Sequence, residues 1–316
     1  MSHSIRRLAR RAAILVASAA VASVLVFGFM SVLPGDPATV ALGVNASPEA
    51  VASLRAEWGT DRPLFTQYVD WAGGLLRWDF GTSYVSRAAI GPQIVDRLAV
   101  TAWLVGAAIL VALLIAIPLG TLSALRHRRF TGLLVSGVSQ LGIAIPAFIM
   151  GIALIFVFAI KLRLVPSGGW TPPTEPGKFL SQLVLPALSL GLIQGAMLTR
   201  YVRSAILEVL REDYMRTARA KGASGVRTLL RHGLRNASIP VVTVLGLHLT
   251  TLLIGSVVIE RVFVIPGLGS LLLDAVANRD LLLVQGVVML LVVAALAINF
   301  VVDILYVVLD PRLRGS

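Results

Sequence analysis

The sequence predicts an all-α integral membrane protein with six transmembrane helices and a large segment between the first two of them. Hydrophobic residues make up 57% of the 316 residues and charged residues only 14%, whereas soluble domains carry about 25% charged residues. Six windows are apolar for about the 20 residues that a helix needs to span a bilayer. Basic residues gather in alternate connections between these windows, as is typical of multi-pass membrane proteins.

The six apolar windows follow one another along the whole chain. The first comes after four arginines, so a cleaved signal peptide is the alternative interpretation. Its apolar run exceeds the 7–15 residues of a signal peptide's apolar region, and we therefore expect a retained span. Pro118, Pro146 and Pro186 lie inside three windows, where neighbouring helices can satisfy the freed backbone groups. The windows are Ala12–Leu33, Ala99–Leu125, Gly132–Ile160, Gln182–Arg200, Ile239–Ile259 and Leu281–Leu309.

Positive charge predicts the orientation, with both termini in the cytosol. The cytosolic segments then contain 18 of the 28 Lys and Arg residues and four acidic residues, whereas the outer segments contain ten basic and eleven acidic residues. The net charge of +12 is thus explained by orientation and by attraction to anionic lipid headgroups. No nucleic-acid partner is expected.

The connection between the first two windows is long and rich in turn-forming residues. Ser47-Pro48 predicts the start of a helix that Gly59 ends, and aromatic spacing predicts a second short helix over Tyr68–Leu76. This segment could cap the headgroups or dock an external partner, and the two interpretations are compatible. The chain is therefore expected to comprise an N-terminus with the first helix (1–33), an extracytoplasmic segment (34–98) and a core domain with five helices (99–316).

The connection 201–236 is basic but still patterned like helices. Leu207, Leu210, Tyr214 and Ala218 recur at spacings of three and four, which predicts one apolar helix face. Gly222 is expected to end this helix. Ser224 is expected to cap a second one over 226–235, and Ser238 with Pro240 to mark the start of the fifth span. The residues alone are compatible with an amphipathic helix on anionic lipid and with an element that docks onto another protein.

Several motifs resemble the permeases of bacterial ABC importers, in the dipeptide/oligopeptide-type subfamily. The stretch YMRTARAKGAS (214–224) followed by LLRHGLRNASIPVVTVLG (229–246) is similar to their EAA loop. The motifs LPGDP (33–37), DRPLFTQYVDW (61–71), WDFGTSY (78–84) and VVDILYVVLDPRLR (301–314) resemble that subfamily in order and spacing. The resemblance implies a type I ABC importer permease fold and, for the loop, a coupling helix that contacts a cytosolic ATPase.

The same resemblance implies partners and contact residues. The chain would form half of a translocation pathway for peptides, together with a second homologous permease, cytosolic ATP-binding subunits and an extracytoplasmic solute-binding protein, in the inner membrane. Arg216 and Thr217 stand where the family has Glu and its first Ala, so a salt bridge from that Glu is not expected. The implied ATPase contacts are Glu212, Tyr214, Arg216, Ala218, Arg219, Lys221 and Gly222.

The sequence lacks the motifs of an enzyme. No G-x-x-x-x-G-K-[ST] phosphate-binding loop occurs, there is no cysteine, and the four histidines are scattered. We therefore expect no catalysis and no cofactor in this chain, and ATP hydrolysis in a separate subunit.

Polar residues inside the windows leave two further hypotheses open. Gln140, Gln194 and His248 could line a solute path, or could form hydrogen bonds between helices. Asp303 is a mid-span carboxylate that could serve an ion-coupled secondary transporter, or could be an interfacial structural residue paired with a neighbouring Arg. A non-transporting receptor or scaffold is the other alternative function. Gly191 and Gly195 form a G-x-x-x-G spacing that permits close contact between helices.

Overall fold

The computed structural model describes residues 3–32, 36–43, 45–220, 228–229 and 233–309. The described residues are helical apart from turns and loops, with an isolated bridge between Thr82 and Ala89 in place of any strand. The predicted fold class is therefore confirmed. The chain forms two compact units, unit 1 (Met1–Leu8, Ala102–Ile265 and Ile298–Ser316) and unit 2 (Ala9–Thr101 and Pro266–Ala297).

Five helices in the described part of the chain are long and apolar enough to cross a membrane. Each contains most or all of a predicted window, but several extend beyond it because polar residues continue the helix. The helix of the fifth predicted window, α11, begins at Leu234, six residues before Pro240, which was expected to mark its start and instead lies inside it. The five are α1 (His3–Val32), α5 (Ile90–Leu125), α8 (Pro176–Arg211), α11 (Leu234–Val262) and α13 (Leu281–Leu309).

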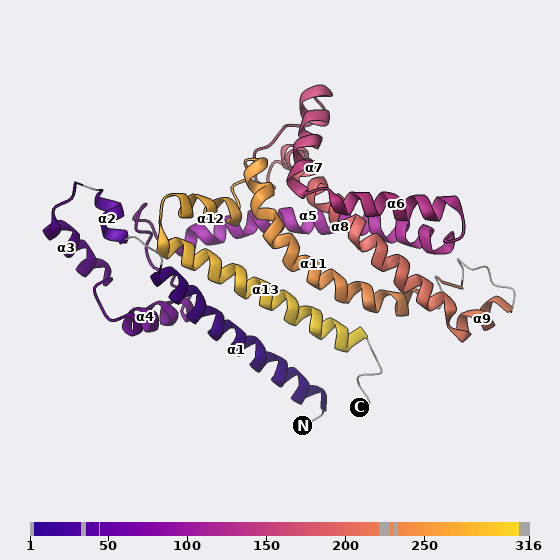
Figure 1. Ribbon diagram of the computed structural model, residues 1–316, viewed down its shortest axis with the longest axis horizontal. Helices are drawn as coiled ribbons and strands as arrows, with labels where there is room; N and C mark the ends of the chain where they lie inside the picture. Colours follow the sequence, from indigo (N-terminus) through magenta and orange to yellow (C-terminus); the bar gives the residue numbers. More distant parts are fainter. Residues whose placement is uncertain (1–2, 33–35, 44, 221–227, 230–232, 310–316) are drawn as a thin grey trace. The chain divides into compact units, whose positions relative to one another are not determined.

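The third window does not form one straight helix. It divides into α6 (Phe130–Ala144) and a second part made of α7 (Ala147–Leu154) and the π-helix η1 (Ile155–Lys161), bent by 100° at the break. The window Gly132–Ile160, predicted as one span with Pro146 inside it, is therefore a bent pair of helices. Ile145 is extended (φ −90°, ψ 123°) because the ring of Pro146 disfavours helical geometry in the preceding residue. Figure 1 shows α7 turning away from α6.

Unit 1 is organised around α8, against which α6, α7 and α11 all pack. α5 meets α8 through glycines. A Cβ atom on Gly191 would lie 2.5 Å from the side chain of Val111, and one on Gly120 would lie 2.7 Å from that of Val202. The predicted G-x-x-x-G spacing therefore serves packing within this chain, and buried alanines and leucines continue the contact.

Unit 2 contains the segment between α1 and α5 together with the start of α13. It forms α2 (Pro37–Leu42), α3 (Pro48–Trp58), α4 (Leu64–Leu76) and α12 (Leu268–Ala277). The predicted boundaries of α3 are confirmed. Ser47 Oγ accepts a hydrogen bond from Ala50 N, and Gly59 ends the helix in the left-handed conformation (φ 67°) that glycine adopts without steric cost. α4 begins four residues before the predicted helix.

Asp280 joins distant parts of unit 2. Its buried carboxylate accepts hydrogen bonds from Ser83 Oγ and from the backbone nitrogens of Tyr84 (3.2 Å) and Leu283 (3.4 Å). The Leu283 contact caps the first turn of α13, and the other two hold the loop before α5. Phe80, in the same loop before α5, packs into an apolar cluster with residues of α5, α12 and α13.

Candidate functional site

The corner between α8 and α9 (Asp213–Ala220) contains most of the residues predicted to contact an ATPase. α8 ends at Arg211, and Glu212 is extended (φ −63°, ψ 146°), so the chain turns before α9 begins (Figure 1). The prediction of one continuous apolar face from Leu207 to Ala218 was wrong for this reason. Helical spacing cannot be carried across a residue that leaves the helix.

Met215 anchors α9 to unit 1. Its side chain is fully buried, with Val209 of α8 and Leu229 in the same apolar cluster. A Cβ atom on Gly233 would lie 2.7 Å from Leu229 Cδ1 and 3.1 Å from Val209 Cγ1. The glycine therefore leaves the space that these side chains fill, and the buried side chain of Met215 packs α9 against the core.

The opposite side of α9 is exposed. Glu212 and Arg216 are both exposed, Tyr214 is 38% exposed, and Ala218 is half-buried. Arg216 forms an ion pair with Asp213 (3.6 Å), and both side chains are largely in solvent, where such pairs contribute little to stability. The side chain of Arg219, the residues Lys221 and Gly222, and most of the second helix predicted over 226–235 lie outside the described residues.

An open groove of about 600 Å³ runs along this corner. Among the described residues, the carboxylates of Glu208, Glu212 and Asp213 line it together with the guanidinium of Arg211. The described lining of the groove therefore has more acidic than basic residues, although the whole connection is basic in sequence. This surface suits a basic side chain from another protein.

The three residues predicted to line a solute path lie on three helices of unit 1. Gln140 is exposed on α6, and Gln194 is buried on α8, where its Oε1 has no hydrogen-bond partner. His248 of α11 packs edge-on against Tyr201 of α8, with ring centroids 5.9 Å apart. No hydrogen bond joins any two of the three in the described part of the chain. Their role as path residues stays a prediction.

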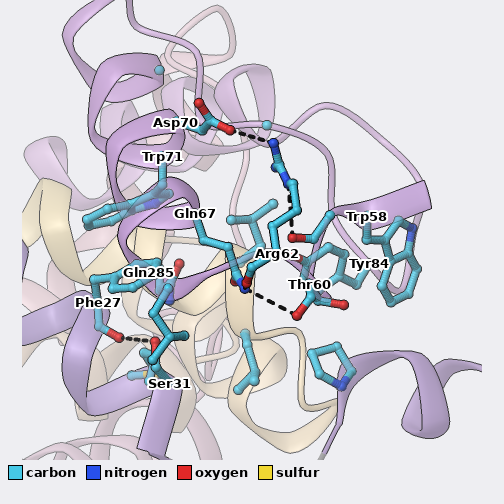
Figure 2. A pocket seen from close by; sticks show the side chains of 18 of the residues that line it. Phe27, Ser31, Trp58, Thr60, Arg62, Gln67, Asp70, Trp71, Tyr84 and Gln285 are labelled. Atoms are coloured by element: carbon cyan, nitrogen blue, oxygen red, sulfur yellow. Dashed lines mark hydrogen bonds and ion pairs between the residues drawn. The ribbon is translucent and has the colours of Figure 1, made fainter. Parts of the chain in front are cut away.

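Unit 2 contains a pocket of about 500 Å³, bounded by the end of α1, the segment from α2 to Tyr84, and the start of α13 (Figure 2). Aromatic rings form much of its wall. Trp58 and Tyr84 stack with centroids 4.3 Å apart, and Phe27 lies 5.8 Å from Trp71. Burial, and next the charge of Asp280, raise the pKa of the Tyr84 phenol above its usual value, so this hydroxyl stays protonated at neutral pH.

Arg62 and Gln67 organise the polar side of the pocket. Arg62 Nη1 donates to Asp70 Oδ2 (2.7 Å), and its Nε donates to the Gly59 carbonyl (3.2 Å). Gln67 Nε2 donates to the carbonyl oxygens of Arg62 (2.7 Å) and Thr60 (3.2 Å). These bonds fix the turn between α3 and α4.

Sequence reasoning missed Met215 and this pocket. The adjacent acids Glu212 and Asp213, which suit the first turn of a helix, could have indicated the new helix start and hence the inward position of Met215. No local sequence signal relates Trp71 to Gln285, because the two side chains line one pocket only in the folded unit. In the described residues, no group of three or more His, Cys, Asp or Glu side chains could hold a metal ion.

Comparison with known proteins matches two family models to the chain. Residues 116–315 match the model described as binding-protein-dependent transport system inner membrane component, and residues 2–105 match the N-terminal model of such membrane components. Among solved structures, inward-facing conformations of the MetNI methionine ABC transporter have a similar fold, with a TM-score of 0.58 and 20% identity over 69% of this chain and 96% of theirs.

Curated relatives extend over nearly the full length. The glutathione transport system permease protein GsiC of Salmonella typhimurium (strain LT2) is 40% identical over 300 residues, covering 95% of this chain and 96% of the relative. The protein of that name from Escherichia coli (strain K12) is 40% identical over 294 residues, covering 93% and 94%. The chain belongs to the binding-protein-dependent transport system inner membrane component family, as a multi-pass, non-catalytic permease subunit of an ABC importer that works with a partner ATPase and a binding protein.

Proposed function

We propose that this permease imports peptides of the dipeptide/oligopeptide class and forms half of the translocation pathway beside a second, homologous permease. The observation that supports the solute class is the 40% identity to glutathione transport permeases over 95% of the chain, because glutathione is itself a small peptide. Three motifs that resemble those of peptide permeases also support this solute class. They are the EAA-like loop (214–246), LPGDP (33–37) and the C-terminal motif (301–314).

In this proposal α9 is the coupling helix, with contacts from Glu212 to Gly222. Its geometry suits the transmission of force, because an exposed face is backed by a side chain, Met215, that is fully buried in unit 1. The acidic groove beside Glu212 would receive a basic side chain of the ATPase. When the ATPase moves, the push would pass through Met215 to α8, whose end lies next to the corner.

We further propose that both termini and residues 201–236 are cytosolic, and that residues 34–98 face the binding protein on the outer side. The distribution of Lys and Arg supports this orientation. Because the chain has no native cysteine, single cysteines can test it. Ser53 on α3 and Thr217 on α9 are both exposed. An impermeant thiol reagent should label Ser53→Cys in intact cells and should label Thr217→Cys only after lysis; the opposite pattern contradicts the orientation.

Transport is tested with the chain reconstituted in liposomes together with a homologous permease, the ATPase subunits and the binding protein. We expect uptake of labelled glutathione and dipeptides that requires ATP and the binding protein. Uptake by the permease pair without the ATPase would contradict the proposal.

Coupling is tested in the same liposomes with Ala218→Trp, which enlarges a half-buried position on α9. We expect uptake to fall at least tenfold while the ATPase subunits retain their own hydrolysis. The control is Ser53→Cys, which makes a small change at an exposed position of α3 and should leave uptake unchanged. Normal uptake by Ala218→Trp would contradict the assignment of α9.

A further inference from the structure

Two polar groups in the pocket of unit 2 lack hydrogen-bond partners. The indole nitrogen Nε1 of Trp71 is buried without an acceptor. Gln285 is 8% exposed, and its side-chain amide forms no hydrogen bond to any residue that the structure describes. The two side chains come from α4 and α13, and both line the same cavity, where Figure 2 shows them near Phe27.

These unpartnered groups contrast with their neighbours. Arg62, Gln67 and Ser31 line the same cavity, and each donates a hydrogen bond within the chain. A buried polar group without a partner costs about 1–3 kcal/mol, so native proteins leave few of them. Trp71 Nε1 is such a group, and its side chain lines the same cavity as that of Gln285. The pair therefore suits a hydrogen-bonding ligand that is not part of this chain.

The chemistry of the two groups limits what that partner can be. A tryptophan N–H only donates, whereas a glutamine amide both donates and accepts. A peptide unit offers the matching set, a carbonyl oxygen for Trp71 and an amide N–H and carbonyl for Gln285. The cavity volume of about 500 Å³ lies within the range of small-molecule sites, and its aromatic walls are typical of such sites.

The charges around the cavity favour an ammonium group over a carboxylate. Its lining includes three carboxylates, from Asp36, Asp70 and Asp79, and one guanidinium, from Arg62. Asp36 and Asp70 form ion pairs with Arg55 and Arg62. Asp79 accepts a hydrogen bond from Gly81 N (2.9 Å) and has no ion-pair partner in the described part of the chain. It is therefore the carboxylate available to a cationic ligand.

We propose that this pocket binds the amino-terminal end of a small peptide, or an α-amino amide of the same chemistry, as a free solute. Asp79 receives the ammonium group, and Trp71 and Gln285 bind the first amide. The biological source of this ligand rests on the proposed peptide transport, whereas the recognition rests on the pocket itself. The segment between α1 and α5 then contributes to solute binding.

The direct test measures binding of radiolabelled phenylalaninamide to the full chain in nanodiscs by equilibrium dialysis. This probe carries an ammonium group, an amide and an aromatic ring. We expect saturable binding, with weaker competition by N-acetylphenylalaninamide, which lacks the charge, and by phenylalanine, which carries a carboxylate. Equal competition by all three compounds would overturn the assigned ligand class without requiring any variant.

Two variants test the assigned groups. Trp71→Phe removes the indole N–H and keeps a ring, and Gln285→Leu removes the amide at similar size. Each should weaken binding about three- to tenfold, the effect of one neutral hydrogen bond. Gln285→Leu removes a polar group that has no partner among the described residues, and it should not lower the thermal midpoint of the free chain. Trp71→Phe also reduces the ring contact with Phe27, so it is judged by affinity alone. A merely structural role would produce the reverse pattern, lower stability with unchanged affinity.

Gln182→Leu is the matched control, because Gln182 Oε1 is also buried without a partner but lies on α8 in unit 1. It should leave the affinity for phenylalaninamide unchanged. Absence of binding at millimolar probe, or unchanged affinity in both pocket variants, overturns the pocket assignment. If binding follows the prediction but the reconstituted importer moves no peptide, the proposed transport function fails and the pocket assignment stands.

Discussion

Different kinds of internal contact stabilise unit 1 and unit 2. In unit 1, α5 and α8 approach so closely that a single methyl group on Gly191 or Gly120 would meet a neighbouring side chain within 3 Å. In unit 2, the short helices of the connecting segment are held by caps, ion pairs and ring contacts, such as Asp36 with Thr39 and Trp58 with Tyr84.

The difference follows from the elements compared, because α5 and α8 are long apolar helices whereas α2, α3 and α4 are short helices outside the spans. In lipid, apolar side chains gain nothing by leaving their surroundings, so helices associate through close packing of small residues. In water, short helices need side chains that satisfy their first backbone N–H groups. Changes of shape should therefore damage unit 1 most, and changes of hydrogen bonding or charge should have smaller, pH-dependent effects in unit 2.

The largest effect is expected at Met215, the apolar anchor of α9. Met215→Ala should destabilise the attachment of α9 by about 2–5 kcal/mol, the range for truncating a buried methionine. Hydrogen exchange measures this as faster exchange of the α9 amides. Tyr214→Ala on the exposed side of α9 is the control and should have a much smaller effect. Unchanged exchange in Met215→Ala would show that α9 is held by contacts other than this side chain.

A smaller loss is expected where α5 and α8 touch. Gly191→Ala places a methyl group 2.5 Å from Val111 and 2.9 Å from the Ala108 carbonyl, and overpacking of this kind costs about 1–3 kcal/mol. Gly106→Ala on α5 is the matched control, since a Cβ there meets nothing within 4 Å. It should be neutral or stabilise by about 0.5–1 kcal/mol. Thermal unfolding in detergent compares them, and equal midpoints would contradict the packing argument.

The spans and the caps of α3 were predictable because their signals are local. A run of apolar residues or a Ser-Pro pair has the same meaning wherever it occurs in the chain. The effect of each proline on its helix could not be predicted from a local signal. Pro118 and Pro186 lie inside helices, whereas Pro146 breaks one. The choice depends on whether neighbouring helices can satisfy the freed carbonyl groups, and a single sequence does not contain that information.

The candidate sites show the same limit. Tyr214 and Arg216 of α9 belong to one eleven-residue motif, and the structure places both at the exposed corner that follows Glu212. The pocket pairs Trp71 with Gln285, more than 200 positions apart, and depends on the folding of unit 2. Long-range pairing of this kind has no sequence period, so composition and spacing could not predict it.

A charge effect is expected at the cap of α2 in unit 2. Burial acts to raise the pKa of Asp36, but hydrogen bonds from Thr39 and the charge of Arg55 outweigh it and hold the pKa below its ordinary value of 3.8. The ionised cap therefore contributes stability above pH 3.8, which is lost as pH falls through the folded-state pKa.

Asp36→Asn keeps a good capping residue but removes the charge, and should cost less than about 1 kcal/mol at neutral pH. The stability difference between wild type and variant should shrink as pH falls below 3.8 towards the lowered folded-state pKa, as measured by thermal unfolding. Ser47→Ala removes a neutral cap on α3 and should show a loss that does not change with pH. A constant difference for Asp36→Asn would contradict the assigned charge effect.

The smallest effect is expected for Arg216→Gln. This variant removes a surface ion pair, a kind of contact that is typical of unit 2 but here lies in unit 1. The ion pair with Asp213 is exposed on both sides, so its loss should change stability by about 0–0.5 kcal/mol, and less at high salt because the charges are screened. Thermal unfolding at low and high salt measures this, and a loss as large as that of Gly191→Ala would show that charge also stabilises unit 1.

If α9 contacts the ATPase as proposed, the same variant should still lower ATP-driven uptake. A drop in uptake with unchanged stability would then locate the effect of Arg216 in the contact between subunits, because the fold of this chain does not depend on it.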